Sequence, residues 1–179
     1  MDNFAEHIVK KELTGSDKAK RIIILVGGII MTLLIAGFAI LMLGQGLLPF
    51  IGLILAAVTG YGTYYLVTNM YVEYEYTFTN GELDIDKIIA KKKRKSMLSV
   101  SVGKFKEFAR YDENAPEETD DMTVVFATNN IASEEYYADF DHEAYGNTRL
   151  IFCPNENMIS NMKKNLPRAL RAKMEESEE

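Results

Sequence analysis

The longest uninterrupted charge run in the sequence consists of five adjacent cations, Lys91, Lys92, Lys93, Arg94 and Lys95. Near a bilayer, each cation that reached an anionic leaflet would gain about 1 kcal/mol. In a strand, however, alternate side chains point to opposite faces, so one surface meets only part of the run. Three interpretations remain open: a solvated strand that signals topology, a general contact with anionic lipid headgroups, and a specific headgroup pocket.

Two groups of mostly acidic residues could also bind a cation or act as acid and base. The first consists of Asp139, Asp141, His142 and Glu143, and the second is the pair Asp84 and Asp86. The first group is predicted to lie in a turn and the second on the exposed face of an alternating strand, which are ordinary places for these residues. Neither group has a second ligand set at fixed spacing. We therefore predict no catalytic residue, no metal site and no cofactor, and a metal-dependent enzyme is only a remote alternative.

Two single residues, Cys153 and His7, have side chains that can react or bind a metal. Cys153 follows an apolar triplet and has no histidine close by in the sequence, so we predict a buried structural thiol. One cysteine cannot form an internal disulfide, which fits a reducing cytosol. His7 is predicted to be a solvated residue rather than a metal ligand.

Two uncharged apolar runs, at 22–43 and 47–68, are separated by only three residues. Each run would form a helix about 33 Å long, enough to cross a hydrocarbon core of about 30 Å. A cleaved signal peptide is the alternative for the first run. The apolar region of a signal peptide has only about 7 to 15 residues, however, whereas this run is longer and a second apolar run follows it at once. The sequence therefore predicts a transmembrane hairpin. Because neither run contains an ionisable side chain, a self-contained transporter or channel is disfavoured.

The cations near the ends of the two runs predict the orientation. Lys18, Lys20 and Arg21 precede the first run, residues 91–95 follow the second, and the connecting turn is uncharged. The positive-inside rule then places both termini in the cytoplasm, in a multi-pass protein of the plasma (cytoplasmic) membrane. From Tyr71 onward the chain carries 15 Lys and Arg against 22 Asp and Glu, a net charge of −7, which disfavours nucleic acid as a partner.

Small residues recur every four positions in both apolar runs, at Gly28, Thr32 and Ala36 and at Gly52, Ala56 and Gly60. Small residues at this spacing share one helix face and let two backbones approach closely. We favour packing within the hairpin, and a homo-oligomer through the same faces is the alternative.

Four domains are predicted along the chain: an amphipathic cytoplasmic segment at 1–21, the hairpin at 22–68, a cytoplasmic domain at 71–174 and an acidic tail at 175–179. In the first segment, Phe4, Ala5, Ile8 and Val9 fit one face of a helix capped by Asp2 or Asn3, which would lie on the inner leaflet or pack on the cytoplasmic domain.

The cytoplasmic domain begins with β patterns. Residues 72–79 and 82–89 alternate with period two around Asn80-Gly81, a strong hairpin signal. Five further strands are expected at 96–102, 104–111, 122–127, 134–140 and 147–153, with an exposed acidic loop at 112–121. Residues 158–174 repeat with helical spacing and include Leu166 as a predicted core residue, and Pro167 should kink or split this helix.

Seven strands followed by one helix resemble the pleckstrin-homology (PH) barrel, in which a C-terminal helix closes one end of two packed sheets. The segment from Tyr76 to Val102, which contains Thr79-Asn80-Gly81-Glu82 and the basic run, resembles bacterial PH-like domains that follow membrane helices. The whole chain is similar to a family of uncharacterised two-span bacterial membrane proteins. The resemblance implies an α+β membrane protein in which a transmembrane hairpin precedes a seven-stranded PH-like β-barrel or sandwich with a C-terminal helix.

The expected function is a non-catalytic interaction or assembly module at the inner face of the membrane. Its expected partners are the lipid bilayer and an unknown membrane or cytoplasmic protein. A sensor of anionic lipid that uses residues 91–95 is the alternative, and the two differ in what those cations contact.

Overall fold

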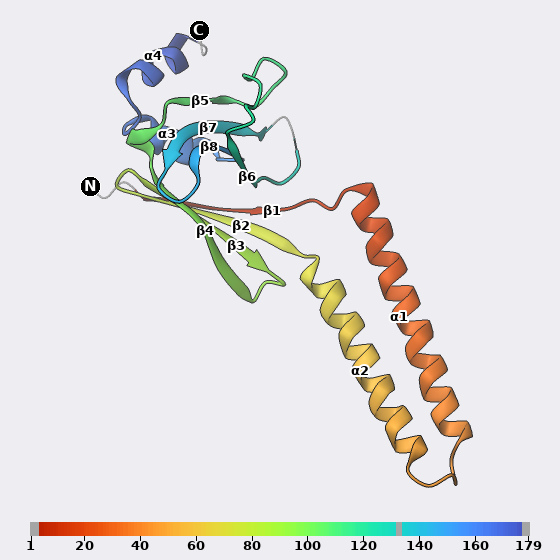
Figure 1. Cartoon of the computed structure of the whole chain (residues 1–179). Helices are drawn as coiled ribbons and strands as arrows, with labels where there is room; N and C mark the ends of the chain where they lie inside the picture. Colours follow the sequence, from red (N-terminus) through yellow and green to blue (C-terminus); the bar gives the residue numbers. More distant parts are fainter. Residues whose placement is uncertain (1–3, 132–133, 177–179) are drawn as a thin grey trace. The chain divides into compact units, whose positions relative to one another are not determined.

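The computed structural model describes residues 4–131 and 134–176. The chain divides into two compact units, of which one comprises residues 1–12 and 72–179 and the other residues 13–71 (Figure 1). The predicted helix cap at Asp2 or Asn3 and the last three residues of the predicted acidic tail lie outside the described residues.

The first sheet, sheet A, contains four antiparallel strands in the order β1-β2-β3-β4. These are β1 (Phe4–Lys10), β2 (Val72–Thr79), β3 (Glu82–Ile89) and β4 (Lys93–Ser101). Asn80 and Gly81 form the turn between β2 and β3 with φ angles of 50° and 97°, the left-handed conformation that this dipeptide favours. Sheet A is therefore assembled from one strand that precedes the helical unit and three that follow it.

The second sheet, sheet B, has the order β5-β7-β8-β6. Its strands are β5 (Glu107–Arg110), β6 (Thr123–Ala127), β7 (Tyr136–His142) and β8 (Gly146–Phe152), and a short 3-10 helix, η1 (Val102–Lys104), leads into it from β4. Strands β6 and β8 are parallel, and the other two pairings are antiparallel. All seven strands predicted from the sequence are present, with ends shifted by a few residues.

A single core joins the two sheets and the C-terminal helices. Tyr76 of sheet A meets Phe152 of sheet B edge to face, with ring centroids 5.7 Å apart. Helices α3 (Glu156–Lys163) and α4 (Arg168–Glu176) are separated at Pro167, which splits the predicted helix. Leu166, between the helices, is 3% exposed and belongs to the core, as predicted.

The N-terminal helix prediction was wrong, because residues 4–10 form strand β1. Ala5 and Val9 are buried on one side of β1, and Phe4 and Ile8 are exposed on the other. The same four apolar residues fit a helical face by spacing alone, and the partner strand β2 lies more than 60 residues away in the sequence. The described residues therefore form eight strands rather than the predicted seven, and the first of these strands precedes the helices.

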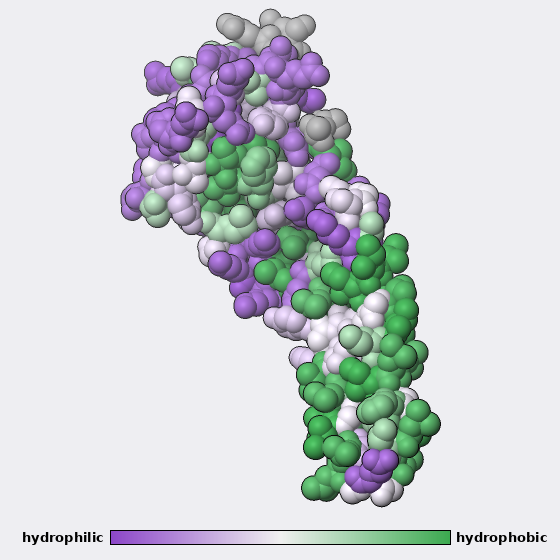
Figure 2. Space-filling view, turned by 45° about the vertical axis from the view of Figure 1, so that its right-hand side comes forward, coloured by the Kyte–Doolittle hydropathy of each residue, from purple (hydrophilic) through white to green (hydrophobic). Residues whose placement is uncertain are grey.

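The helical unit consists of α1 (Gly15–Leu41) and α2 (Leu48–Asn69). Thr14 caps α1 by accepting a hydrogen bond from the backbone N–H of Asp17, and Pro49 lies at the start of α2, where its missing N–H costs nothing. Both helices are long and apolar enough to cross a membrane, and only 6% and 11% of their most apolar stretches are buried. Their surface is accordingly hydrophobic (Figure 2).

Small residues form the contact between α1 and α2. A Cβ atom built on Gly28 would lie 2.2 Å from Thr63 Oγ1, and one on Gly52 would lie 2.7 Å from the Ala39 Cβ. At Gly60 the nearest atom, in Thr32, is 3.6 Å away. Residues of both predicted small-residue faces therefore meet within the hairpin, and at Gly28 and Gly52 the close approach leaves no room for a Cβ atom.

Candidate functional site

The basic run occupies the turn between β3 and β4 and the first part of β4. Ala90 and Lys91, the two central turn residues, have φ angles of 55° and 56°, and the N–H of Lys92 donates to the carbonyl oxygen of Ile89 at 3.1 Å. Two positive φ angles are typical of the tight turns that match strand twist, although glycine or asparagine usually supplies them. All five cations are exposed, with two in the turn and three in the strand.

Arg94 differs from the four lysines because it has carboxylate partners. Its Nη2 atom lies 2.6 Å and 2.8 Å from the two carboxylate oxygens of Glu75, and its Nε lies 3.9 Å from Asp86. The Glu75 side chain is only 7% exposed, so Arg94 neutralises a nearly buried charge. No lysine of the run forms an ion pair within 4.0 Å among the described residues.

The turn lies at the end of sheet A where the chain enters and leaves the helical hairpin. Ile89 pairs with Val72 on one side and with Lys93 on the other. The carbonyl of Val72 also accepts a hydrogen bond of 3.0 Å from the N–H of Lys11. Val72, Ile89 and Lys93 thus form one row across sheet A. At this row the chain leaves for the hairpin after Lys11 and returns from it at Val72.

Three of the acidic candidates, Asp139, Asp141 and Asp86, form ion pairs with cations of the same domain. Asp139 lies in strand β7, not in the predicted turn, and binds Arg149, while Asp141 forms a 2.6 Å ion pair with Lys106. His142 stacks on Tyr145 at 4.7 Å. Asp84 is exposed, as expected from its alternating strand. Within residues 4–131 and 134–176, no group of three or more His, Cys, Asp or Glu side chains is placed to hold a metal ion.

Cys153 is a buried thiol, as predicted. Its Sγ donates to Asn129 Oδ1 at 3.2 Å, and its backbone N–H donates to the Tyr76 hydroxyl at 3.3 Å. Burial raises the pKa of the Cys153 thiol, which keeps it protonated and unreactive at neutral pH. Asn129 also links this cluster to the segment after β1, because its carbonyl accepts a hydrogen bond from the Glu12 N–H at 3.0 Å.

His7 is half-buried rather than solvated. It lies on the inward-facing side of β1, with its ring 6.1 Å from that of Tyr76. Burial lowers the pKa of His7, and the negative charge of Glu134 partly opposes this effect. The prediction that His7 is solvated was wrong because it placed His7 on the polar face of a helix, whereas residues 4–10 form a strand.

Sequence reasoning missed Arg149, the most buried charged side chain of the described residues at 1% exposure. Its Nε and Nη2 atoms each lie 2.7 Å from an oxygen of Asp139, its Nη1 donates to the Pro116 carbonyl, and its guanidinium lies 4.7 Å from the Tyr137 ring centroid. The available signal was an arginine directly before the apolar triplet that ends strand β8, opposite an aspartate in β7.

The model of the family described as "Bacterial PH-like domain (DUF6106)" matches residues 1–172. The chain belongs to this family. The matched region includes β1 and both helices together with the two sheets, so the hairpin and the PH-like domain form one family unit. No curated protein and no solved structure matches the chain. PH-like domains are generally non-enzymatic and commonly mediate lipid or protein interactions.

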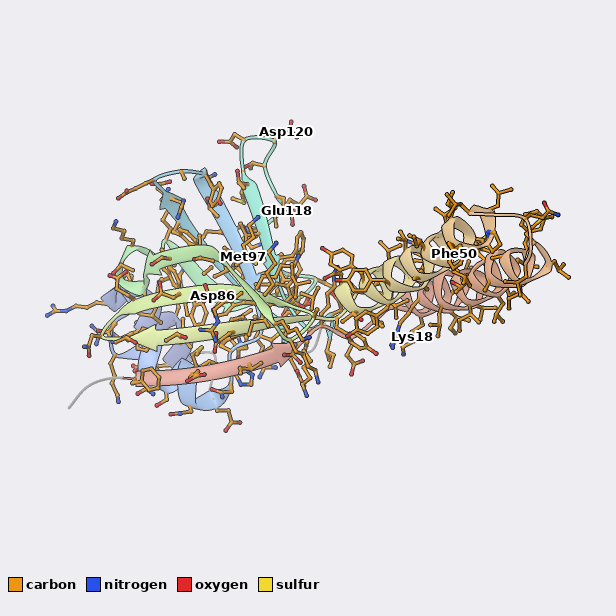
Figure 3. The ribbon with its side chains drawn as sticks, turned by 90° about the horizontal axis from the view of Figure 1, so that it is seen from below. Lys18, Phe50, Asp86, Met97, Glu118 and Asp120 are labelled. Carbon is orange, nitrogen blue, oxygen red and sulfur yellow. The ribbon has the colours of Figure 1, made fainter. Side chains whose placement is uncertain are left out.

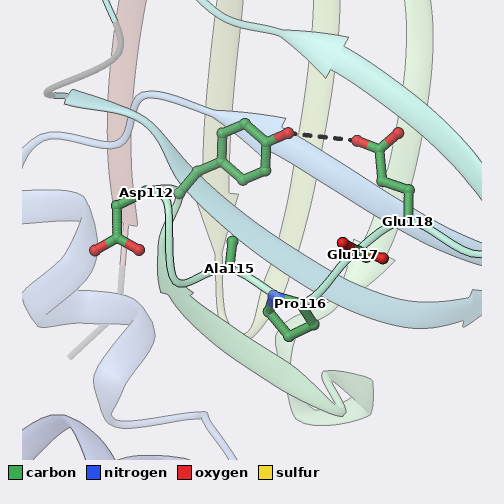
Figure 4. Close-up of a pocket in the computed structure, with 6 residues that line it drawn as sticks. Asp112, Ala115, Pro116, Glu117 and Glu118 are labelled. Atoms are coloured by element: carbon green, nitrogen blue, oxygen red, sulfur yellow. Dashed lines mark hydrogen bonds between the residues drawn. The ribbon is translucent and has the colours of Figure 1, made fainter.

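The acidic loop of the PH-like domain forms a small cavity of about 320 Å³ (Figure 4). Tyr111 and Pro116 line it, and the Tyr111 hydroxyl donates to Glu118 at 3.4 Å. The loop is exposed, as predicted, with Asp120 near its tip (Figure 3), but the bond from Arg149 to Pro116 fixes its middle to sheet B. The cavity is acidic and shallow, so we assign it no ligand.

A larger groove of about 720 Å³ runs beside strand β5, which is an edge strand of sheet B. Phe108 and Arg110 line it from the strand, and Leu170, Lys173 and Met174 line it from α4. The groove combines apolar and charged side chains next to an open strand edge, which are properties of surfaces that bind extended peptides.

Proposed function

We propose that this protein is a membrane-anchored, non-catalytic interaction module that presents its PH-like domain at the inner face of the plasma membrane. The observation that carries the proposal is the insertion of the apolar hairpin between two neighbouring strands of one sheet. Because β1 pairs with β2 along its full length, the chain must return to the side from which it left. Two helices long enough to span a bilayer satisfy this requirement with two crossings.

The charge distribution supports the cytoplasmic side for the PH-like domain. Lys18, Lys20 and Arg21 precede the apolar part of α1, the lysines of the β3–β4 turn follow α2, and the turn between the helices is uncharged. This asymmetry is the pattern of the positive-inside rule.

Cysteine labelling tests the anchoring and its orientation. The single native cysteine is buried, so Ser16→Cys and Gln45→Cys each add one accessible thiol to the full-length protein. In intact cells, an impermeant maleimide should label Gln45→Cys and leave Ser16→Cys unlabelled. Labelling of Ser16→Cys would refute the orientation, and quantitative recovery of the protein in the soluble fraction would refute the anchoring.

The groove beside β5 is the surface that we propose for a protein partner. A photo-crosslinking residue at Ala109, on the exposed part of β5, should join the full-length protein to a discrete partner in native membranes. The matched control replaces Ser99, an exposed residue of β4 in sheet A. Equal crosslinking from the two positions would argue against the groove.

A second candidate function is contact of the basic turn with anionic lipid. The support is specific: the turn belongs to the row of sheet A that contains Val72 and adjoins Lys11, next to the residues that lead into the hairpin. In an anchored protein, only a few residues separate Val72, at this end of sheet A, from the membrane helix α2. Cations that reach the bilayer surface from this end would each gain about 1 kcal/mol against anionic headgroups.

A further inference from the structure

A β-bulge divides the basic run between the two faces of sheet A. Strands β3 and β4 pair regularly up to Ile85 and Leu98, but Asp86 then pairs with Ser96, so Met97 is an extra residue in β4. Figure 3 labels Asp86 and Met97 in sheet A. A bulge of this kind changes the face to which the side chains of β4 between the turn and Met97 point.

Register and burial identify the face that each cation occupies. Ile85 and Leu98 are buried against the core. Beyond the bulge, Lys87 pairs with Lys95, and Ile89 pairs with Lys93. Because side chains alternate along each strand, Lys87, Lys93 and Lys95 share the core-facing side of the sheet, at the end where it extends to the turn.

Arg94 occupies the opposite face with Glu75 and Asp86. Without the extra residue, Lys95 would pair with Ile88 and point toward these carboxylates, and Arg94 would replace it among the lysines. The bulge therefore separates a neutralised arginine from a group of lysines.

The lysine face carries uncompensated charge. Lys87 and Lys95 are directly opposite each other, an arrangement of like charges that destabilises a strand pair. The other residues of these rows on the same side are uncharged: Val9 and Tyr74 beside Lys87, and Val72 and Ile89 beside Lys93. No ion pair among the described residues involves Lys87, Lys93 or Lys95.

We infer that Lys87, Lys93 and Lys95 form a binding face for a phosphate group, which an anionic lipid headgroup or a free phosphate ion can supply. This rests on the second candidate function and deepens it, because it assigns binding to three lysines rather than to the whole run. Opposite residues have Cβ atoms about 5 Å apart, so long flexible side chains can direct their ammonium groups to one phosphate. Bound phosphate relieves the repulsion between Lys87 and Lys95, and Lys91 and Lys92 in the turn contribute only general attraction.

The test compares two double variants of the full-length protein with equal charge change, Lys93→Gln/Lys95→Gln and Lys91→Gln/Lys92→Gln. Binding of dioctanoyl phosphatidylglycerol to the protein in nonionic detergent is measured by native mass spectrometry, with dioctanoyl phosphatidylcholine as the reference lipid. We expect about tenfold weaker phosphatidylglycerol binding for the first variant and less than about threefold for the second, since charge-assisted hydrogen bonds outweigh general attraction. Arg94→Gln should bind like the wild type.

Inorganic phosphate, added as a competitor, distinguishes the two sources. If millimolar phosphate displaces the lipid, and if this displacement requires Lys93 and Lys95, the face binds the free ion. If it does not displace the lipid, the headgroup is the ligand. Equal loss of phosphatidylglycerol binding in both double variants would overturn the lysine face but retain lipid contact by the whole run. If the protein bound phosphatidylglycerol no more tightly than phosphatidylcholine, both proposals would be overturned.

Melting of the ligand-free protein provides a second readout. If the lysines are a binding face, Lys95→Gln should leave the melting temperature unchanged or raise it, because it removes the repulsion from Lys87 while it weakens lipid binding. A lower melting temperature together with unchanged lipid binding would show that Lys95 has only a structural role.

Discussion

Sheets A and B have four strands each but differ in how the chain supplies them. All of sheet B comes from residues 107–152, whereas sheet A combines residues 4–10 with residues 72–101 across the whole hairpin. Their outer surfaces differ as well. The Arg94 side chain in sheet A is 60% exposed above its carboxylate partner, and that of Arg149 in sheet B is 1% exposed beneath the acidic loop.

This difference separates two kinds of stability. Sheet B is a local structure fastened by a buried ion pair, and loss of one partner there leaves an uncompensated charge. Sheet A depends on a long-range strand pairing, and the cation of its main ion pair, Arg94, is exposed. We therefore expect sheet A to be sensitive to the loss of a strand and sheet B to be sensitive to the loss of a single side chain.

The largest effect should come from removal of β1. Deletion of residues 1–12 exposes the β2 edge and removes the bond between Glu12 and Asn129, so a soluble fragment of residues 72–179 should not melt cooperatively. A matched fragment that keeps residues 1–12 and replaces 13–71 by about four flexible residues should fold, because Lys11 and Val72 are hydrogen-bonded neighbours.

Far-UV circular dichroism and thermal melting compare the two fragments. A β spectrum and a cooperative transition are expected only for the fragment that contains β1. Equal melting would show that β1 is dispensable and would remove the proposed dependence of sheet A on the strand before the hairpin.

The second effect concerns the buried arginine of sheet B. Arg149→Met leaves Asp139 buried without its cation, which should lower the free energy of unfolding by about 3 to 5 kcal/mol. Arg94→Met in sheet A should lower it less, by about 1 to 3 kcal/mol, because the nearly buried Glu75 then loses a cation that is itself 60% exposed. Urea unfolding of the linker-joined fragment measures both changes, and similar losses would contradict the contrast between the sheets.

A smaller effect is a pH dependence located in sheet A. The pKa of His7 is lowered in the folded state, while the unfolded chain has the ordinary value of about 6.5. Below that pH the unfolded state binds more protons, so stability should fall as the pH decreases from about 6.5 to the folded-state pKa. Melting temperatures between pH 8 and pH 5 should decline less for His7→Gln than for the wild type. Parallel curves would show that His7 does not contribute.

The smallest effect is expected at an exposed ion pair of sheet B. Asp141 and Lys106 form an ion pair in which the side chains are 69% and 52% exposed, so Asp141→Asn should change the free energy of unfolding by less than about 0.5 kcal/mol. Asp139→Asn, two residues earlier in β7, is the matched change at the buried pair and should cost several times more. Urea unfolding should rank the two variants in this order.

Local patterns in the sequence were sufficient to predict most of the fold. Alternation and Asn80-Gly81 predicted the β2–β3 hairpin, and apolar spacing with Pro167 predicted a C-terminal helix that is either kinked or split. They were not sufficient for β1, because Phe4, Ala5, Ile8 and Val9 fit both periods and only the distant strand β2 decides between them. A local reading of the sequence does not contain that pairing.

The candidate site was predicted only in outline. The sequence identified residues 91–95 as one exposed cationic run, and all five are exposed. It did not separate Arg94 from the lysines, because this depends on a one-residue bulge at Met97, which nothing in the alternation of β4 indicates. Arg149 was missed for a related reason, since its burial depends on the loop around Pro116.

The insertion of the hairpin between β1 and β2 also affects the order of events during synthesis. At about 5 to 20 residues per second, the ribosome needs about 3 to 12 s to make residues 13–71, and during this time β1 has no partner. Under the proposed anchoring, sheet A can close only after both helices have entered the bilayer. A chain with a single crossing would leave β1 and β2 on opposite sides of the membrane, and its unpaired β2 edge would distinguish it from a correctly inserted protein for quality-control proteases.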